Sequence, residues 1–384
     1  MQQNSARQKF CDSQLTNYAR LASPLISLVS VGNCLAPHAR VLRAVGFLRR
    51  RGGGAAADCW HRAYRRAVLL LTGTYLLQEI VYALRARNNV EKLSKVMFLL
   101  LCHVTSIAKQ IVFYADADRI DEVLRNLDAP PLAGSGAGGA GGAARLARTA
   151  AAARRLLVGY AGCAVVVAHI WLALTLLARA AGQPVEFCFW TGFDTQPLVA
   201  FVPCLLYSHY VITLVGIANT TMDGFMATIL YLCKTHLEIL REDLRTLPER
   251  ARMAAAAGEQ HEAALLREFV RCFSHYQAVT EIATSFQDIF GLAIFIQMGV
   301  GGSILCMAAY KMASLSVASA EFASMLVFIA CVFLQLFLYC YYGNELKVEV
   351  RSLLYLTWRA KRSLEIRNGR SYMFGCGYIF YYYS

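Results

Sequence analysis

Long apolar runs at regular intervals are the main pattern of this 384-residue sequence. Six runs have the length, about 17 to 25 residues, that an α-helix needs to cross the hydrocarbon core of a bilayer. They occupy residues 67–84, 96–114, 156–178, 197–217, 289–310 and 322–342. The pattern predicts an all-α, polytopic membrane protein. Its helical bundle would extend over residues 67–346, after an N-terminal segment of residues 1–66.

Two amphipathic stretches follow the fourth apolar run and predict helices that continue out of the membrane. Residues 265–286 have helical periodicity, and so do residues 223–247, where one face carries a leucine seam. The seam consists of Leu237, Leu240, Leu244 and Leu247. An exposed apolar seam of this length needs a partner. We therefore expect residues 218–286 to form anchor helices below the membrane, with the four leucines as a contact between subunits.

The distribution of basic residues predicts the orientation in the membrane. Of the 38 Lys and Arg residues, 31 lie in residues 1–66, 115–155, 218–286 and 344–384, whereas the other three loops carry six. Cytoplasmic loops of membrane proteins are enriched in Lys and Arg. The N-terminus is therefore expected in the cytoplasm. The same enrichment accounts for the net charge of +13 without a nucleic-acid partner.

A shorter apolar stretch, residues 21–37, is interrupted by a proline, a glycine and an asparagine. Its length is at the lower limit for a span, so we interpret it as an interfacial or re-entrant piece. If it crossed the membrane, the chain would have seven spans and an external N-terminus. That alternative would suit a G-protein-coupled receptor, with residues 118–120, Asp-Arg-Ile, after the third span. The Asn-Pro-x-x-Tyr motif expected at the end of the final span is absent.

Composition and motifs argue against an enzyme or a metalloprotein. The mean hydropathy is +0.42, and 57% of the residues are hydrophobic against 16% charged, which is typical of a membrane protein. The 13 cysteines have no zinc-ligand spacing and no paired disulfide spacing. The sequence also lacks HExxH, P-loop and GxSxG motifs. We expect no catalytic residues, no metal site and no cofactor.

Two ionisable residues lie within predicted spans, Glu79 in the first and Lys109 in the second. Such groups are costly in a membrane and are usually paired or functional. These two lie towards opposite ends of antiparallel neighbours, so we expect each to extend to its own interface instead of pairing with the other. His275, before the fifth span, is expected to pack between helices.

Aromatic, sulfur-containing and histidine side chains gather in the halves of the spans that this orientation places outside. An apolar cavity with a few polar groups suits a small volatile ligand. Ordinary helix packing is the alternative role for each residue. The candidate ligand-binding residues are Phe98, His103, His169, Trp171, Phe201, Tyr207, Met307, Met325 and Phe328. The aromatic loop of residues 179–196 would form a lid over this cavity or an aromatic belt at the interface.

Two short motifs carry a resemblance to a known family. The sixth apolar run ends in YCYYGNEL at residues 339–346, and LRAVGF precedes the first run at residues 42–47. Both resemble insect odorant receptors, as do the amphipathic pattern that Asp223 opens and the position of His275. The resemblance extends over residues 42–346. Gustatory receptors share the same plan, so the boundary with that group stays open.

The resemblance implies an odorant receptor of the plasma membrane, spanning it several times. It would bind a small volatile odorant among the outer halves of its helices. The family's subunits assemble with a shared co-receptor as tetrameric cation channels, with cytoplasmic anchor helices between subunits and a seventh helix along the pore. Membrane lipid and the co-receptor are therefore the expected partners.

Residues 347–384 depart from the family pattern, which continues with a full apolar span. The last apolar run here, residues 373–383, has 11 residues, whereas a span needs about 20. We expect this tail to replace a complete seventh helix, so that the chain alone would give no odorant-gated current. An incomplete gene model and a truncated isoform would both explain such a sequence.

Overall fold

The computed structural model describes residues 32–50, 54–132 and 139–368, in which all regular structure is helical. Its helices are α2 (Gly32–Ala44), α3 (Ala55–Arg85), α4 (Val90–Ala115), α5 (Ala117–Leu127), α6 (Gly139–Ala180), α7 (Leu198–Ala256), α8 (His261–Ala313) and α9 (Ala320–Asn368). Within the described residues, six helices are long and apolar enough to cross a membrane: α3, α4, α6, α7, α8 and α9. The predicted fold class is confirmed.

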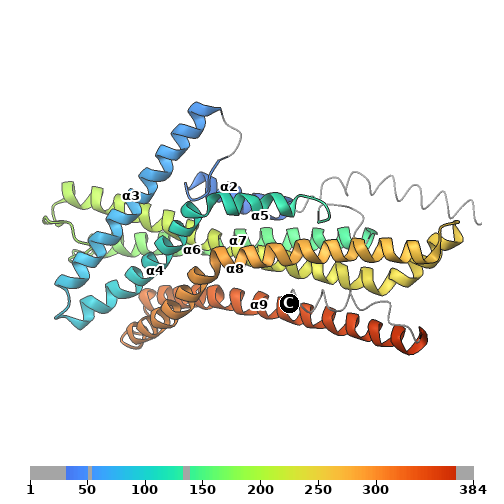
Figure 1. Cartoon of the computed structure of the whole chain (residues 1–384). Coiled ribbons are helices and arrows are strands. Elements are labelled where there is room, and N and C mark those ends of the chain that lie inside the picture. Colours follow the sequence, from blue (N-terminus) through green and yellow to red (C-terminus); the bar gives the residue numbers. More distant parts are fainter. Residues whose placement is uncertain (1–31, 51–53, 133–138, 369–384) are drawn as a thin grey trace, which may run out of the picture.

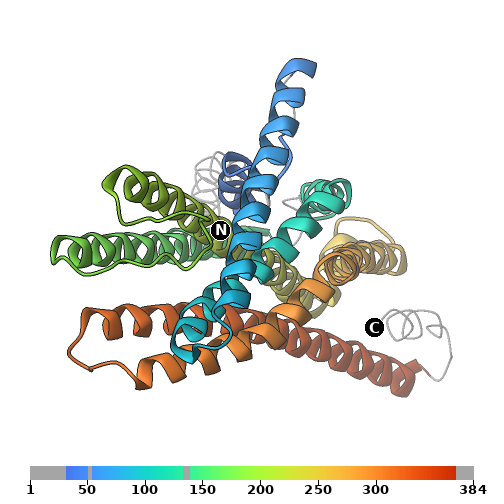
Figure 2. The same cartoon turned by 90° about the vertical axis from the view of Figure 1, so that its left-hand side faces the viewer.

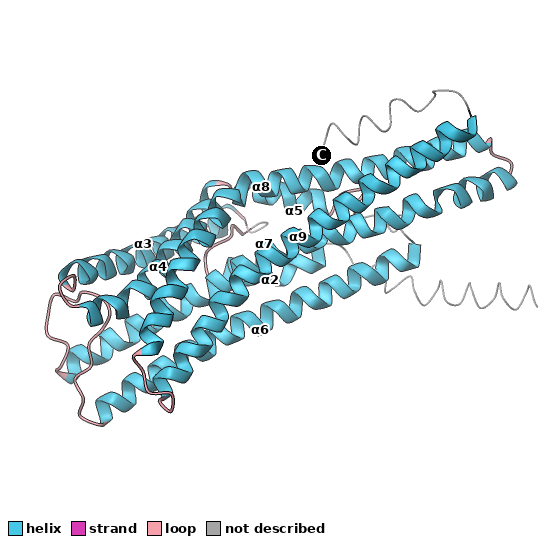
Figure 3. Ribbon diagram, turned by 90° about the horizontal axis from the view of Figure 1, so that it is seen from below, coloured by secondary structure: helices cyan, strands magenta, loops and turns pink. Residues whose placement is uncertain are grey.

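The long helices α6, α7, α8 and α9 run roughly along one direction, α3 and α4 are inclined to it, and three of the connections lie at the same end (Figures 1 and 3). These connections are residues 86–89, 181–197 and 314–319, and we call this end the loop end. Seen from there, α6 and α7 lie on one side of the molecule and α8 and α9 on the other (Figure 2). The candidate site lies near this end.

At the opposite end, which we call the extension end, α7, α8 and α9 project far beyond α3 and α4 (Figure 1). Helix α7 has 59 residues and α8 has 53. At 1.5 Å rise per residue these helices are roughly 90 and 80 Å long, well over twice the hydrocarbon thickness of about 30 Å. The amphipathic stretches after the fourth apolar run therefore do continue the membrane helices.

The leucine seam of α7 is buried inside the chain. Leu237, Leu240 and Leu247 are 2%, 0% and 8% exposed, and Leu244 is partly buried against the same core. Helix α8 folds back along α7, and α9 lies beside both (Figure 1). The expectation that this seam is exposed is wrong, because the periodicity of one helix does not tell whether its partner lies in the same chain or in another.

The stretch of residues 21–37 lies partly outside the described residues, which begin at residue 32. Residues 32–37 form the first turns of α2, and Cys34 and Leu35 are each 1% exposed. Helix α2 packs against α6 and α7 in the main hydrophobic core. This part of the stretch is therefore covered by protein.

Helix α9 continues without a break through residues 343–346 to Asn368. Two ion pairs join this continuation to α7: Lys234 Nζ lies 2.7 Å from Glu345 Oε2, and Arg241 Nη1 lies 3.1 Å from Glu349 Oε2. The motif at residues 339–346 is thus part of a longer helix. The final run of residues 373–383 lies outside the described residues.

Candidate functional site

Five of the nine candidate residues meet in one cluster near the loop end, formed by α4, α6, α8 and α9. They are Phe98, Trp171, Met307, Met325 and Phe328. The ring of Phe98 lies 5.3 Å from that of Phe328 and 6.1 Å from that of Trp171, in edge-on geometry. Such pairs add to the stability that comes from burying their area. We call these five residues the first aromatic cluster.

A second aromatic cluster lies between α3, α7 and the loop of residues 181–197. It contains Phe201 and Tyr207 from the candidate set, together with Tyr75, Phe187 and Phe189. Tyr75 is 2% exposed, and its ring lies 5.6 Å from Tyr207 and 5.3 Å from Phe189. The hydroxyl of Tyr207 donates a hydrogen bond to Gln78 Oε1 at 3.0 Å. This bond orients the Tyr207 ring beside the buried Tyr75.

A cavity of about 130 Å³ joins the two clusters. Tyr75 of the second cluster and Trp171 of the first both line it, as does Leu99. Most of the wall is apolar, with polar atoms supplied by a few residues that include Ser208 and His209. An apolar cavity with few polar groups binds small molecules largely by dispersion and water exclusion. The hydrogen-bonding groups would then orient the ligand.

The loop of residues 181–197 covers this cavity from the loop end. Phe187 lines the cavity, and Phe189 is 4% exposed within the second cluster. The backbone N–H of Trp190 donates a hydrogen bond to the backbone oxygen of Gln78 at 3.1 Å. Trp190 and Phe193 have exposed side chains. One part of the loop therefore forms a cover, while the other part presents aromatic rings at the surface.

His103 lies below the second cluster, in a buried pair with Glu79. Its Nδ1 is 2.7 Å from Glu79 Oε2, and Glu79 is 0% exposed. The ring of Tyr75 meets the His103 ring edge-on at 5.4 Å. The expectation that Glu79 extends to an interface is wrong, because α4 supplies a hydrogen-bonding partner inside the bundle.

Lys109 is also buried, at 1% exposed, and its Nζ lies 2.6 Å from Asp223 Oδ1. Two groups of α9 donate hydrogen bonds to the same carboxylate, the amide of Gln335 and the hydroxyl of Tyr339. The four residues join α4, α7 and α9, and we call them the polar cluster. The expectation that Lys109 extends to an interface is wrong, since its counter-ion comes from a distant part of the sequence.

Trp171 is the one candidate residue of the nine that lines the cavity; the others pack behind its wall or, like His169, lie away from it. The side chain of His169 is exposed, its Nδ1 lies 2.8 Å from the backbone oxygen of Val165, and its ring meets that of His209 edge-on at 5.0 Å. His209 is the histidine that lines the cavity. Tyr75 and Cys188 also line it and were not among the candidates. Tyr75 stands four residues before Glu79, a helical spacing that places both on one buried face.

His275 is 2% exposed and packs against His236, with the two ring centroids 5.3 Å apart. The packing role expected for His275 is therefore observed. Among the described residues, no group of three or more His, Cys, Asp or Glu side chains gathers in a way that could hold a metal ion.

These features define a membrane protein whose helical bundle holds a small, mainly apolar cavity near its loop end. The family profile described as 7tm Odorant receptor matches residues 89–358 of the chain. Odorant receptor 94a of Drosophila melanogaster is 24% identical over 174 residues, which cover 45% of this chain and 43% of that receptor. The matched part thus spans less than half of this curated relative.

Two solved structures have the same fold. The olfactory receptor OR5 from Machilis hrabei aligns with a TM-score of 0.70 at 13% identity, over 83% of this chain and 81% of that one. The same receptor in complex with eugenol gives 0.64 at 14% identity, over 84% and 81%. Since the family profile covers well over half of the sequence, the chain belongs to the 7tm odorant receptor family. This membership decides against the G-protein-coupled alternative.

Proposed function

We propose that this chain is an odorant receptor subunit that binds a small volatile molecule in the cavity between the two aromatic clusters. The observation that carries this proposal is the cavity itself, covered by residues 181–197 and lined mainly by apolar groups. The related OR5 receptor has been solved with eugenol. Small aromatic volatiles are therefore the first ligand class to test. The subunit would signal as part of a ligand-gated cation channel.

We infer that the loop end is extracellular and the N-terminus cytoplasmic, in a plasma-membrane protein. The three predicted loops that contain these connections, residues 85–95, 179–196 and 311–321, carry six Lys and Arg residues, whereas the segments on the other side carry 31. Positive charge is enriched in cytoplasmic loops. This orientation would open the cover of residues 181–197 towards the medium that delivers the odorant.

Assembly with a co-receptor, as a tetramer, is the partner arrangement that we propose. The contact surface is not the buried leucine seam, although Leu244 is only partly covered. Large apolar side chains are exposed along the extension end of α7, α8 and α9 instead. They are Met253, Leu266, Val270, Val348 and Tyr355. Apolar groups beyond the membrane need a protein partner more than those that face lipid, so this end is the better candidate for subunit contacts.

The test compares two tyrosines in cells that express the chain with a co-receptor. Tyr207 belongs to the second aromatic cluster, whereas Tyr160 packs in a separate cluster with Ala227 and Leu338. Tyr207 does not line the cavity itself, but its ring packs 5.6 Å from that of Tyr75, which does. Tyr207→Ala removes this aromatic contact from the cavity wall and should change the half-maximal concentrations across an odorant panel that includes eugenol by about tenfold. Tyr160→Ala, matched for expression at the surface, should change them much less. Equal effects of the two substitutions would contradict the assignment of the cavity.

A further inference from the structure

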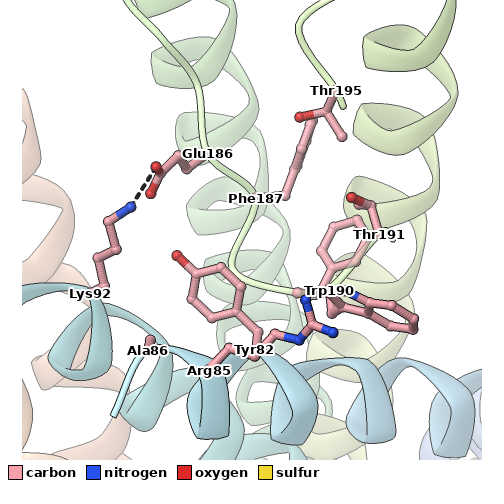
Figure 4. A pocket seen from close by; sticks show the side chains of 10 residues that line it. Tyr82, Arg85, Ala86, Lys92, Glu186, Phe187, Trp190, Thr191 and Thr195 are labelled. Atoms are coloured by element: carbon pink, nitrogen blue, oxygen red, sulfur yellow. Dashed lines mark hydrogen bonds and ion pairs between the residues drawn. The ribbon is translucent and has the colours of Figure 1, made fainter. Parts of the chain in front are cut away.

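A second and larger hollow lies at the loop end, outside the cavity described above. Its volume is about 340 Å³, and it is open to the surface. Four aromatic side chains wall it: Tyr82 from α3 and Phe187, Phe189 and Trp190 from the loop of residues 181–197. Figure 4 shows the rings of Tyr82, Phe187 and Trp190 around a common space, with Thr191 and Thr195 at its margin. We call this hollow the vestibule. Its volume is in the range of small-molecule sites.

Three charged side chains line the vestibule. Two of them form an ion pair, and the third is a cation. Lys92 Nζ and Glu186 Oε1 lie 2.6 Å apart, so these two charges neutralise each other (Figure 4). The remaining charge is the guanidinium of Arg85, which lies over the Trp190 ring at 5.1 Å from its centroid. Among the described residues no carboxylate pairs with Arg85. Among the residues that the structure describes, Arg85 is therefore the one charge of the vestibule that no opposite charge pairs with, and it lies beside aromatic walls.

The geometry of Arg85 suits a carboxylate ligand. A guanidinium is planar, and stacking on an aromatic ring uses its face while its N–H donors stay free in the plane. Those donors match the two oxygens of a carboxylate, which they bind bidentately. Arg85 stands in the last turn of α3, where a cation is also favoured by the helix dipole. The helix dipole accounts for a cation at this position, but it does not account for the aromatic hollow beside it.

We propose that the vestibule is a second ligand site, for small monocarboxylates with an aromatic or alkyl body, and that Arg85 binds the carboxylate. The apolar body lies against Tyr82 and Phe187. Phe187 and Glu186 line both the vestibule and the inner cavity, so the two spaces adjoin. A ligand bound in the vestibule would also contact the loop of residues 181–197, which covers the cavity.

The experiment measures binding of phenylacetate and of its neutral methyl ester to the purified full chain in phosphatidylcholine nanodiscs. Saturable binding of both compounds is expected, because both can occupy the aromatic hollow. Arg85→Gln should weaken phenylacetate binding about fivefold, the upper range for a solvent-exposed ion pair, and leave ester binding unchanged. Arg87→Gln is the matched control, because Arg87 is also exposed, stands two residues later and does not line the vestibule.

Several outcomes would overturn this proposal. Equal loss of acid and ester binding in Arg85→Gln would mean that the hollow recognises shape alone. Equal loss in Arg85→Gln and Arg87→Gln would mean that surface charge attracts the anion without a site. Competition by phosphatidylglycerol in the nanodisc would assign Arg85 to a lipid phosphate instead. The measurement needs neither a co-receptor nor a current, so its failure is distinguishable from failure of the proposed channel function.

Discussion

Replacing Lys109 by Met would leave the carboxylate of Asp223 without its counter-ion in the interior of the helix bundle. The side chains of Asp223 and Lys109 are 0% and 2% exposed, so water cannot take the place of the lost ammonium. Removing one partner of a buried ion pair typically costs about 3 to 5 kcal/mol. Gln335 and Tyr339 still donate to Asp223, so we expect about 3 kcal/mol, the lower end of that range.

The measurement is equilibrium unfolding of the purified chain in mixed micelles with a rising fraction of sodium dodecyl sulfate, followed by tryptophan fluorescence. Lys92→Met is the matched control, because Lys92 also stands on α4 and its pair with Glu186 has the same 2.6 Å separation. Its side chain and that of Glu186 are 44% and 56% exposed. An exposed pair contributes at most about 1 kcal/mol, so Lys92→Met should cost far less than Lys109→Met.

A double-mutant cycle separates the charge effect from loss of packing. Asp223→Asn removes the negative charge and retains one acceptor oxygen, in place of the two oxygens to which Gln335 and Tyr339 separately donate. Lys109→Met combined with Asp223→Asn should therefore be more stable than Lys109→Met alone, with a coupling energy of about 2 kcal/mol, within the usual range for contacting residues. Additive costs, or equal costs for Lys109→Met and Lys92→Met, would refute the conclusion that the buried pair is ionised and stabilises the bundle.

Two further predictions concern the N-terminal part of the chain. An N-terminal epitope tag should be labelled by antibody only after cells are permeabilised, because 31 of the 38 basic residues lie on the same side of the predicted spans as the N-terminus. Labelling of intact cells would contradict this orientation. Burial lowers the pKa of His38 in α2 from 6.5 to about 4. The folded state therefore binds this proton more weakly than the unfolded state does. The free energy of unfolding should fall as the pH falls from about 6.5 to about 4. His38→Gln should reduce that loss in unfolding scans at stepped pH while changing little at pH 8, and an unchanged pH profile would contradict it.

The spans could be predicted from the sequence because an apolar run of sufficient length has few other stable structures. The rotation of each helix about its own axis could not be predicted in this way. Residues 156–178 are apolar on nearly every side, so the sequence contains no signal for which face of α6 meets the bundle. Trp171 turned inward as expected, while His169, two residues earlier, is exposed beside His209. Histidines on such a helix cannot be assigned to a cavity without the neighbouring helices.

The buried charges show a second limit of prediction from sequence. Lys109 and Asp223 are 114 positions apart, and Glu79 and His103 are 24 apart. Glu79 and Lys109 could be recognised as unusual within apolar runs, but the partner of each depends on which helices become neighbours. The leucine seam has the same ambiguity, since Leu240 would be buried equally well by α8 or by another subunit.

Helix α9 joins the first aromatic cluster to the polar cluster through one face. Met325 and Phe328 pack in the first aromatic cluster, and Gln335 and Tyr339 follow on the same face with helical spacing. Over these 14 residues the helix extends about 21 Å. No described residue of α9 lines the cavity, but Trp171 does, and its ring lies 6.3 Å from that of Phe328. A ligand that shifts Trp171 would therefore act on α9 and on its two donors to Asp223, and a buried carboxylate tolerates the loss of its donors poorly. Because such a packed polar contact is either made or broken, α9 can transmit occupancy near the loop end as a discrete change towards the extension end.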